Sequence, residues 1–291
     1  MKFLGKNIAL IVVGVTAAIG LHEGAAIAFT ITPNNNPNQL LTNLLGNTAG
    51  LSNFTINLVG DGRAFGTFTD DPFRLKSAVA MSTGRVIDLA GVNTIGTDLS
   101  TDFGLPGVSG DSISMQISFD NSTADNLFFQ YVFGSEEFVE FGGSQFNDSF
   151  SLTLNGFNQA KLSDGKTVTI NNLAVTPFGP FHPDFINNRV GTAPASAVTR
   201  LDGYTKPLLF AAPLKKNARN TLVINVRDAS DGIFDSAVFI KGGTLGTVRP
   251  PDIGDGDGGG DGGNPRVPEP SSTLGILAFG VLSAGFWWKK R

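Results

Sequence analysis

Between residues 54 and 240 the chain contains ten short runs of apolar, aromatic and β-branched residues, the types that favour β-strands. Nearly all are bounded by Gly, Asn, Asp or Pro, which are typical of turns. No helix is interleaved with them, so we expect an all-β fold, an antiparallel β-sandwich of jelly-roll type. The ten runs are Phe54–Val59, Ala64–Thr69, Ala78–Met81, Ile113–Phe119, Leu127–Phe133, Phe150–Leu154, Thr167–Ile170, Leu208–Ala211, Leu222–Val226 and Ala237–Ile240.

Two of these runs also predict how their strands are buried. Leu127–Phe133 is apolar except at Gln130, which indicates a strand that is covered on both faces. Ile113–Phe119 alternates strictly between apolar and polar residues, which places one face on a core and the other in solvent. Before the first run, Asn38–Gly46 has apolar pairs one turn apart, an Asn at its start and a Gly at its end. This pattern predicts one short helix, capped by Asn38.

Composition restricts the chemistry of the chain. None of the 291 residues is Cys, which excludes disulfides, thiolate nucleophiles and thiolate zinc sites. Without the first 28 residues and the final basic triplet, 16 basic and 24 acidic residues remain, so the net charge is near −8. An acidic body favours cations as partners and disfavours nucleic acid.

Acidic side chains concentrate in two connections. The one after Leu127–Phe133 carries Glu136, Glu137, Glu140 and Asp148, which repel one another unless they point into water or are neutralised by a cation. The other joins Leu222–Val226 to Ala237–Ile240.

If those two runs pair as a hairpin, Asp228, Asp231 and Asp235 converge at its closing end. Carboxylate oxygens without Cys select hard cations, so we predict a Ca²⁺ site formed by Asp228, Asp231 and Asp235 with Glu136 and Glu137. The alternative is the ordinary use of Asp in turns, where its side chain bonds its own backbone.

The first acidic connection carries a family signature. The signature residues lie between Gly134 and Asp148, and two further segments belong with them, Ser82-Thr83-Gly84 and Asp228 to Phe239. Together they resemble the bacterial choice-of-anchor L domain. The resemblance covers roughly residues 35–245 and implies a surface-associated domain whose C-terminal anchor varies. The signature residues are Gly134, Ser135, Glu136, Glu137, Phe138, Glu140, Phe141, Phe146, Asn147 and Asp148.

The N-terminus has the layout of a secretory signal peptide. Lys2 and Lys6 precede the apolar run Ile8–Leu21, and Ala26 and Ala28 form a small-x-small cleavage site. We expect cleavage after Ala28, which makes residues 1–28 a signal peptide. A transmembrane anchor is the alternative, although the apolar run is short for one.

The C-terminal region predicts a linker and a sorting tail after the β domain of residues 29–248. Residues 249–266 are rich in Gly and Asp and almost free of apolar residues, which is typical of a solvated, flexible linker. Residues 267–291 contain Pro268-Glu269-Pro270, an apolar span and Lys289-Lys290-Arg291. This tail resembles a PEP-CTERM signal, which implies sorting by an exosortase in bacteria that make exopolysaccharide. A plain transmembrane helix is the alternative, and it would also display the domain outside the cell.

Catalysis has few candidates. His182 is the single histidine after the predicted signal peptide, and nothing near it in the sequence resembles a nucleophile elbow, so we assign no catalytic residue. Glu136, Glu137 and Glu140 could supply the two carboxylates of a glycosidase. Around His182, the loop Pro177–Pro194 carries Phe178, Phe181 and Phe185, which either cap the core or line a ligand face.

Two functions follow from these patterns. The first is an exported binding or structural protein at the cell surface or in the extracellular matrix, associated with exopolysaccharide and not an enzyme. The second is a secreted carbohydrate-active enzyme that uses the Glu cluster. Binding to isolated exopolysaccharide without release of reducing sugar would favour the first, and loss of turnover on Glu→Gln changes would establish the second.

Overall fold

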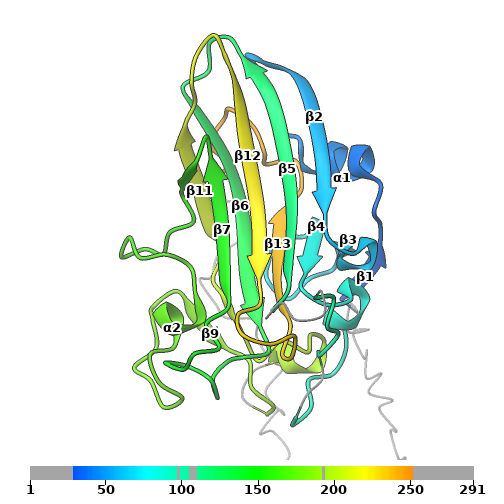
Figure 1. The fold of residues 1–291 in the computed structure, drawn as a ribbon, viewed down its shortest axis with the longest axis vertical. Helices are drawn as coiled ribbons and strands as arrows, with labels where there is room; N and C mark the ends of the chain where they lie inside the picture. Colours follow the sequence, from blue (N-terminus) through cyan, green and yellow to red (C-terminus); the bar gives the residue numbers. More distant parts are fainter. Residues whose placement is uncertain (1–28, 97–98, 105–109, 192–193, 252–291) are drawn as a thin grey trace, which may run out of the picture.

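The chain folds into two antiparallel β-sheets that pack face to face (Figure 1). The structure, a computed structural model, describes residues 29–96, 99–104, 110–191 and 194–251. The predicted signal peptide, most of the linker and the whole sorting tail lie outside these residues. In the described part of the chain, no helix has both the length and the apolar character needed to cross a membrane.

The first sheet has eight strands in the order β1-β3-β4-β13-β6-β10-β9, and β11 also pairs with β6. Its centre is β6, which pairs with β13 on one side and with β11 and β10 on the other. The strands are β1 (Thr30–Pro33), β3 (Phe65–Thr69), β4 (Ser77–Ser82), β6 (Asn126–Ser135), β9 (Phe185–Asn187), β10 (Gly203–Thr205), β11 (Leu208–Pro213) and β13 (Ser236–Lys241).

The second sheet has five strands in the order β2-β5-β12-β7-β8. Its long central pair, β5 and β12, runs in register over the full length of both strands. The strands are β2 (Leu51–Val59), β5 (Ser112–Asn121), β7 (Ser149–Leu154), β8 (Phe157–Asn158) and β12 (Ala218–Arg227). Short helical segments complete the described fold: α1 (Pro37–Leu44), α2 (Ile170–Leu173), η1 (Gly62–Ala64), η2 (Val86–Leu89) and η3 (Pro194–Ala197).

Aromatic side chains join the two sheets across the core. Phe150 of β7 packs on Tyr131 and Phe133 of β6, with ring centroids 5.0 and 6.2 Å apart. All three side chains are buried, and burial of each stabilises the sandwich by about 1.5–3 kcal/mol. In Figure 1, β7 of the second sheet lies next to β6 of the first.

The predicted β-sandwich and nine of its ten strands are confirmed, with bounds that differ by a few residues. The prediction of a strand at Thr167–Ile170 is wrong: Thr167 and Thr169 form only isolated bridges, and Ile170 begins α2. The reason is a local cap, because the Thr169 hydroxyl accepts a hydrogen bond from Asn172 N at 3.2 Å. No sequence pattern predicted the short strands β1, β8, β9 and β10.

The predicted helix is confirmed, but it starts earlier than Asn38. Asn36 is the cap, since its side chain accepts a hydrogen bond from Gln39 N at 3.2 Å. Pro37 occupies the first turn, where its fixed φ suits a helix and its missing N–H costs nothing.

Both burial predictions are confirmed. Residues of β6 from Phe129 to Ser135 are all buried, and its Gln130 donates from Nε2 to Pro251 O at 2.7 Å. In β5 the apolar side chains of Ile113, Met115 and Ile117 are buried, whereas the polar residues between them are less so.

The predicted hairpin between the strands around Leu222–Val226 and Ala237–Ile240 is wrong. β12 pairs with β5 and β7 in the second sheet, whereas β13 pairs with β4 and β6 in the first. The connection 228–235 therefore crosses from one sheet to the other. The connection 136–148, between β6 and β7, makes the same kind of crossing at the same end of the sandwich (Figure 1).

Candidate functional site

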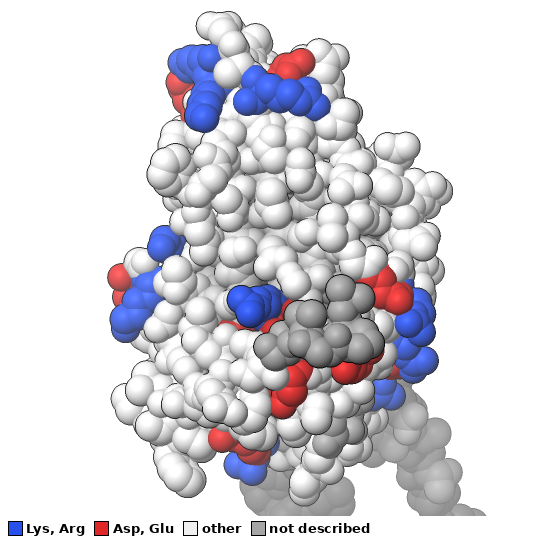
Figure 2. Space-filling model, viewed as in Figure 1, with Lys and Arg blue, Asp and Glu red and all other residues white. Residues whose placement is uncertain are grey.

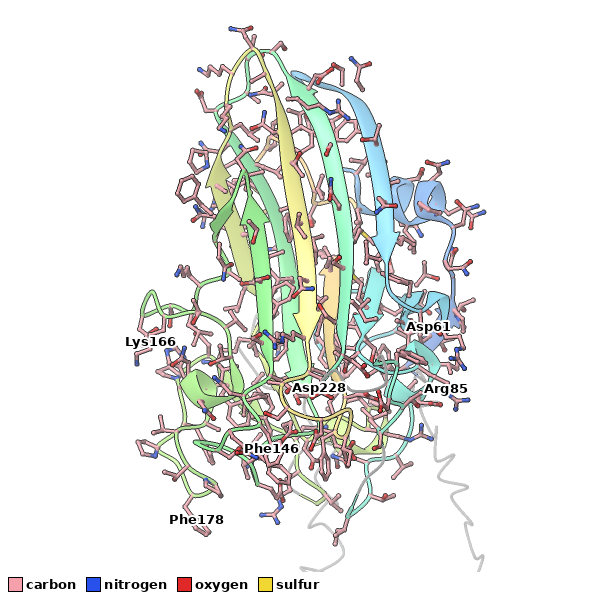
Figure 3. The ribbon with its side chains drawn as sticks, in the orientation of Figure 1. Asp61, Arg85, Phe146, Lys166, Phe178 and Asp228 are labelled. Carbon is pink, nitrogen blue, oxygen red and sulfur yellow. The ribbon has the colours of Figure 1, made fainter. Side chains whose placement is uncertain are left out.

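The two crossing connections carry five buried carboxylates at the end of the sandwich where they meet. Each of these side chains belongs to a residue that is at most 2% exposed. We call this group the carboxylate cluster; it consists of Glu136, Glu137, Asp148, Asp228 and Asp235. Figure 3 labels Asp228 at this end of the sheets, and Figure 2 shows acidic atoms reaching the surface there.

Asp148 ties the two crossing connections together. Its Oδ1 accepts a hydrogen bond from Ala229 N at 2.8 Å, and its Oδ2 accepts one from Ser236 Oγ at 2.7 Å. Ala229 lies in the segment that links β12 to β13, and Ser236 is the first residue of β13, so both oxygens of this carboxylate are already engaged. Asp148 thus has a structural role in positioning that segment.

Two hydrogen bonds hold the Asp235 carboxylate, one from the residue after β4 and one from the segment before β5. Its Oδ1 accepts from Thr83 Oγ1 at 3.3 Å, and its Oδ2 accepts from Thr101 N at 3.2 Å. The carboxylate lies directly against Gly84, where any Cβ would collide with it. This contact gives a physical reason for glycine in the Ser82-Thr83-Gly84 motif.

The two glutamates of the cluster differ in their partners. Glu136 Oε2 accepts from Leu99 N at 2.7 Å. Glu137 donates from its backbone N to Ser135 Oγ at 2.9 Å, but its Oε2 is buried and accepts no hydrogen bond. An acceptor that is removed from water without a donor costs about 1–3 kcal/mol, more when it is charged.

Asp228 is the most unusual member of the cluster. It is fully buried, and neither Oδ1 nor Oδ2 has a hydrogen-bond partner. Its backbone N, in contrast, has a partner and donates a hydrogen bond to Asp111 O at 2.9 Å. Asp111 in turn accepts from Phe103 N at 2.7 Å through Oδ2, whereas its buried Oδ1 has no partner. Asp111 was not among the residues that the sequence analysis singled out.

Burial raises the pKa values of these carboxyl groups. It raises the pKa of Asp228 to about 10, helped by the negative charges of Asp148, Asp231, Glu137 and Asp235. Burial likewise raises the pKa of Glu137 to about 9, with charge repulsion led by Asp148. The pKa of Asp148 and that of Asp235 rise to about 7, because burial outweighs their hydrogen bonds. The cluster therefore requires protons or a cation at neutral pH.

The predicted site residues that lie outside the cluster are more exposed. Asp231 is half-buried and accepts from Ile233 N at 3.3 Å, the turn geometry that we expected as an alternative. Glu140 is exposed and forms an ion pair with Arg189 at 3.0 Å.

Within the described ranges, no group of three or more His, Cys, Asp or Glu side chains is arranged so that it could hold a metal ion. The Ca²⁺ site stays a prediction.

The other signature residues position these connections. A Cβ at Gly134 would lie 2.7 Å from Leu201 Cδ1. Phe138 is fully buried against Phe133 and Phe185. Phe141 forms an edge-to-face pair at 5.3 Å with Phe146, which Figure 3 labels, and Asn147 Oδ1 accepts from Asn171 N at 2.9 Å. Ala26, Ala28 and Pro268-Glu269-Pro270 lie outside the described residues.

A second candidate site is a pocket of about 390 Å³ near α2, which we call the Phe181 pocket. Aromatic and apolar side chains share its wall with charged and amide side chains, as in many ligand sites. The lining residues are Ser163, Asp164, Lys166, Asn172, Val175, Pro180, Phe181, His182 and Pro183.

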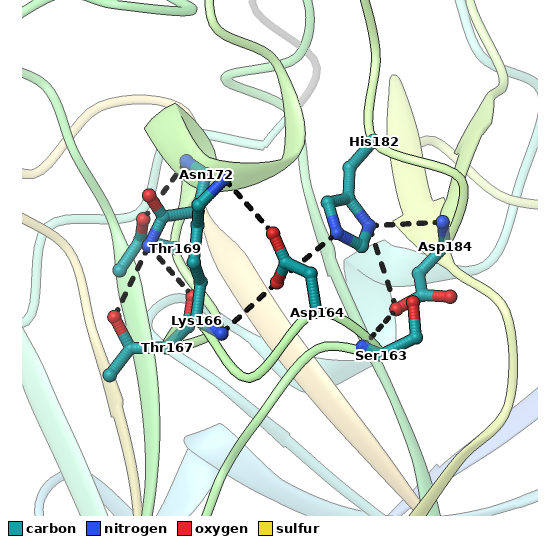
Figure 4. Close-up of polar contacts among 8 residues, drawn as sticks. All are labelled: Ser163, Asp164, Lys166, Thr167, Thr169, Asn172, His182 and Asp184. Carbon is teal, nitrogen blue, oxygen red and sulfur yellow. Dashed lines mark hydrogen bonds and ion pairs between the residues drawn. The ribbon is translucent and has the colours of Figure 1, made fainter.

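Polar contacts fix one side of the Phe181 pocket (Figure 4). His182 Nδ1 accepts from Asp184 N at 3.1 Å, so its Nε2 carries the proton that faces Asp164 Oδ1 at 3.3 Å. Asp164 also pairs with Lys166 at 2.9 Å, and this pairing lowers the pKa of Asp164 to about 2. The imidazole is buried and oriented, whereas the charged pair faces solvent.

The aromatics of this loop divide between the two expected roles. Phe185 is 9% exposed and packs on Phe138, so it caps the core. Phe178 is 95% exposed and Phe181 is 37% exposed, so these two rings face solvent. The sequence placed all three rings in one loop but did not distinguish their roles.

Three solved structures show low similarity to this chain. A family 35 carbohydrate-binding module from an environmental isolate is 15% identical, with 56% of this chain and 90% of that chain covered and a TM-score of 0.23. TmCBM61, solved in complex with β-1,4-galactotriose, is 10% identical, with 72% and 98% covered and a TM-score of 0.27. The enzymatically active domain of tailspike protein 4 from bacteriophage CBA120 is 13% identical, with 72% and 21% covered and a TM-score of 0.23.

No curated protein matches the chain. The sequence profile of the Choice-of-anchor L domain, in contrast, matches residues 30–246, from β1 to the segment that follows β13. This match covers both sheets and every signature residue. The chain therefore belongs to the choice-of-anchor L domain family.

Proposed function

We propose that the chain is an exported domain of the cell surface or extracellular matrix that binds polysaccharide at the Phe181 pocket and does not cleave it. The observation that carries this proposal is the solvent-facing pair Phe178 and Phe181 in one loop, with the second ring lining a pocket that also contains Asp164, Lys166 and Asn172. Exposed apolar side chains that gather beside a pocket are typical of ligand-binding grooves.

The chemistry of this pocket suits a sugar. The C–H face of a pyranose ring is apolar and weakly positive, so it packs on the negative face of an aromatic ring such as Phe181. The hydroxyls around the sugar ring donate to a carboxylate or an amide oxygen and accept from an ammonium group, which Asp164, Asn172 and Lys166 supply in that order. The pocket volume of about 390 Å³ is in the range of small-molecule sites and admits one or two sugar units.

The carboxylate cluster favours binding over glycoside hydrolysis. A glycosidase needs two carboxyl groups on either side of a bound sugar, with access for the chain. Glu136 and Glu137 are at most 2% exposed, so a polysaccharide does not reach them in this structure. Glu140 is accessible but forms an ion pair with Arg189.

The binding test compares two loop variants with a matched control. Phe178→Ala and Phe181→Ala each remove an exposed ring of the proposed site, and Phe157→Ala removes a ring on β8 that is 70% exposed. With isolated exopolysaccharide in a calorimeter, we expect at least about a tenfold loss of affinity for the Phe181 variant, since contact area and ring interaction together exceed about 1.4 kcal/mol.

The Phe157 variant should bind as the unchanged protein does. Equal affinity of all three variants, or release of reducing sugar by the unchanged chain, would contradict the proposal.

Export and sorting are tested separately. Intact-mass analysis of native protein from fractionated cells should show cleavage after Ala28 and processing near Pro268-Glu269-Pro270 by an exosortase-type enzyme, with the body in the envelope or medium. Before processing, the apolar span of the tail would hold the chain in the membrane. Full-length protein in the cytosol would contradict this part of the proposal.

A further inference from the structure

We propose that the carboxylate cluster binds one divalent cation of the Ca²⁺ type, with Asp228, Glu137 and Asp231 as its side-chain ligands. This site is separate from the Phe181 pocket, and it does not depend on sugar binding. The cation would connect the two crossings between the sheets, residues 136–148 and 228–235, at the end of the sandwich.

The first argument is the set of oxygens without partners. Both side-chain oxygens of Asp228 and Oε2 of Glu137 are buried and accept no hydrogen bond. Asp228 is fully buried and Glu137 is 1% exposed, so bulk water does not solvate them. Buried polar atoms almost always have partners, and a group that lacks one calls for an explanation such as an ion. A cation would satisfy all three oxygens at once.

The second argument is that the neighbouring carboxylates already have hydrogen-bond partners. Asp148 uses both oxygens to hold Ala229 and Ser236, and Asp235 uses both to hold Thr83 and Thr101. These hydrogen bonds fix the backbone on either side of the unpartnered oxygens. Such a rigid frame around free ligands is what distinguishes a binding site from a simple concentration of charge.

The third argument concerns the type of cation and its access. The ligands are all oxygens, which hard cations prefer, and Ca²⁺ tolerates the irregular geometry that side chains from two loops provide. Asp228 and Glu137 are not accessible to solvent, but Asp231 is only half-buried. A cation would therefore first meet Asp231 as it enters from solvent. Gly110 packs against the backbone oxygens of both Asp228 and Asp231, which places these two residues side by side.

Binding requires a local adjustment. The described side chains do not already form a complete metal site, so Asp228, Glu137 and Asp231 must turn toward the cation as it enters. Asp231 would give up its 3.3 Å contact with Ile233 N. This contact is long for a hydrogen bond and is therefore a small loss. Calcium sites of extracellular modules bind with Kd on the order of 10⁻⁴–10⁻³ M, which sets the concentrations to use.

The test uses the full chain, freed of metal with a chelator, and titrates it with CaCl₂ up to about 10 mM while heat of binding and Tm are measured. We expect saturable binding of one ion and a rise in Tm of about 5 °C or more near saturation. Asp228→Asn should weaken binding at least about tenfold. As a matched control, Asp61→Asn changes a half-buried carboxylate outside the cluster that pairs with Arg63, and it should bind as the unchanged chain does.

Three outcomes would overturn the proposal. One is no heat and no Tm shift with CaCl₂, in which case protons alone neutralise the cluster. Another is equal affinity of the Asp228 variant and the unchanged chain. If Asp228→Asn does not fold, Glu137→Gln takes its place. The third outcome is then a Glu137 variant that binds Ca²⁺ as tightly as the unchanged chain. Loss of polysaccharide binding with Ca²⁺ binding retained would refute only the proposed function.

Discussion

Asn in place of Asp228 should stabilise the metal-free protein, although it removes a native acidic residue. Asp228 is fully buried, and burial raises its pKa to about 10, whereas an unfolded chain has a value near 3.9. Since the folded state holds a proton that the unfolded state releases, the stability that this group contributes falls as pH rises from about 4 toward 10. At pH 7 the cost has an upper limit on the order of 4 kcal/mol.

The amide of Asn does not titrate, so Asp228→Asn avoids this cost. It still buries polar atoms without partners, at about 1–3 kcal/mol, so the net gain in the free energy of unfolding at pH 7 should be about 1–3 kcal/mol. At pH 4.5, close to the unfolded pKa of about 3.9, the titration cost of Asp228 falls to about 1 kcal/mol, so the gain should shrink toward zero or reverse.

Urea unfolding with excess chelator at pH 4.5 and pH 7.5 measures this difference. The difference between the two pH values reports only the effect of Asp228 titration on the free energy of unfolding, because packing differences between Asn and Asp are present at both. A variant that is less stable than the unchanged chain by the same amount at both pH values would refute the reasoning. Adding CaCl₂ at pH 7.5 should reverse the order, since the unchanged chain alone keeps its full set of ligands.

Two further variants test the packing around the core and the cluster. Tyr131→Phe removes a buried hydroxyl that has no hydrogen-bond partner, so it should raise the free energy of unfolding by about 1–2 kcal/mol, and a loss of similar size in urea unfolding would contradict this. Gly84→Ala places a Cβ against the Asp235 carboxylate and should lower the free energy of unfolding by about 1–3 kcal/mol; an unchanged urea midpoint would show that Asp235 can move aside.

Local patterns predicted the strands well because each pattern reports burial within a few residues. The alternation in Ile113–Phe119 and the continuous apolar run of Leu127–Phe133 both matched the observed strands β5 and β6. At Thr167–Ile170 the β-branched residues favoured a strand, but the hydroxyl of Thr169 caps a helical turn instead. A side-chain cap competes with strand pairing over the same few residues, and propensity alone does not decide between them.

The candidate site was predicted in part for a wrong reason. Asp228 and Asp235 were expected to meet across a hairpin, yet their strands belong to different sheets. They come together because the connection between them crosses the end of the sandwich next to residues 136–148. The roles of Phe178 and Phe185 differ for a similar reason: only Phe185 has Phe138 to pack against.

The all-β class, the short helix, the positions of the acidic connections and the aromatic loop are predictable from residue order, since each follows from the residue types along a few turns of chain. Which strands share a sheet, which carboxylates are buried and which of their oxygens lack a donor become visible only in the folded molecule. Burial and hydrogen bonding depend on segments far apart in the chain, and so does the free energy of keeping a charge out of water.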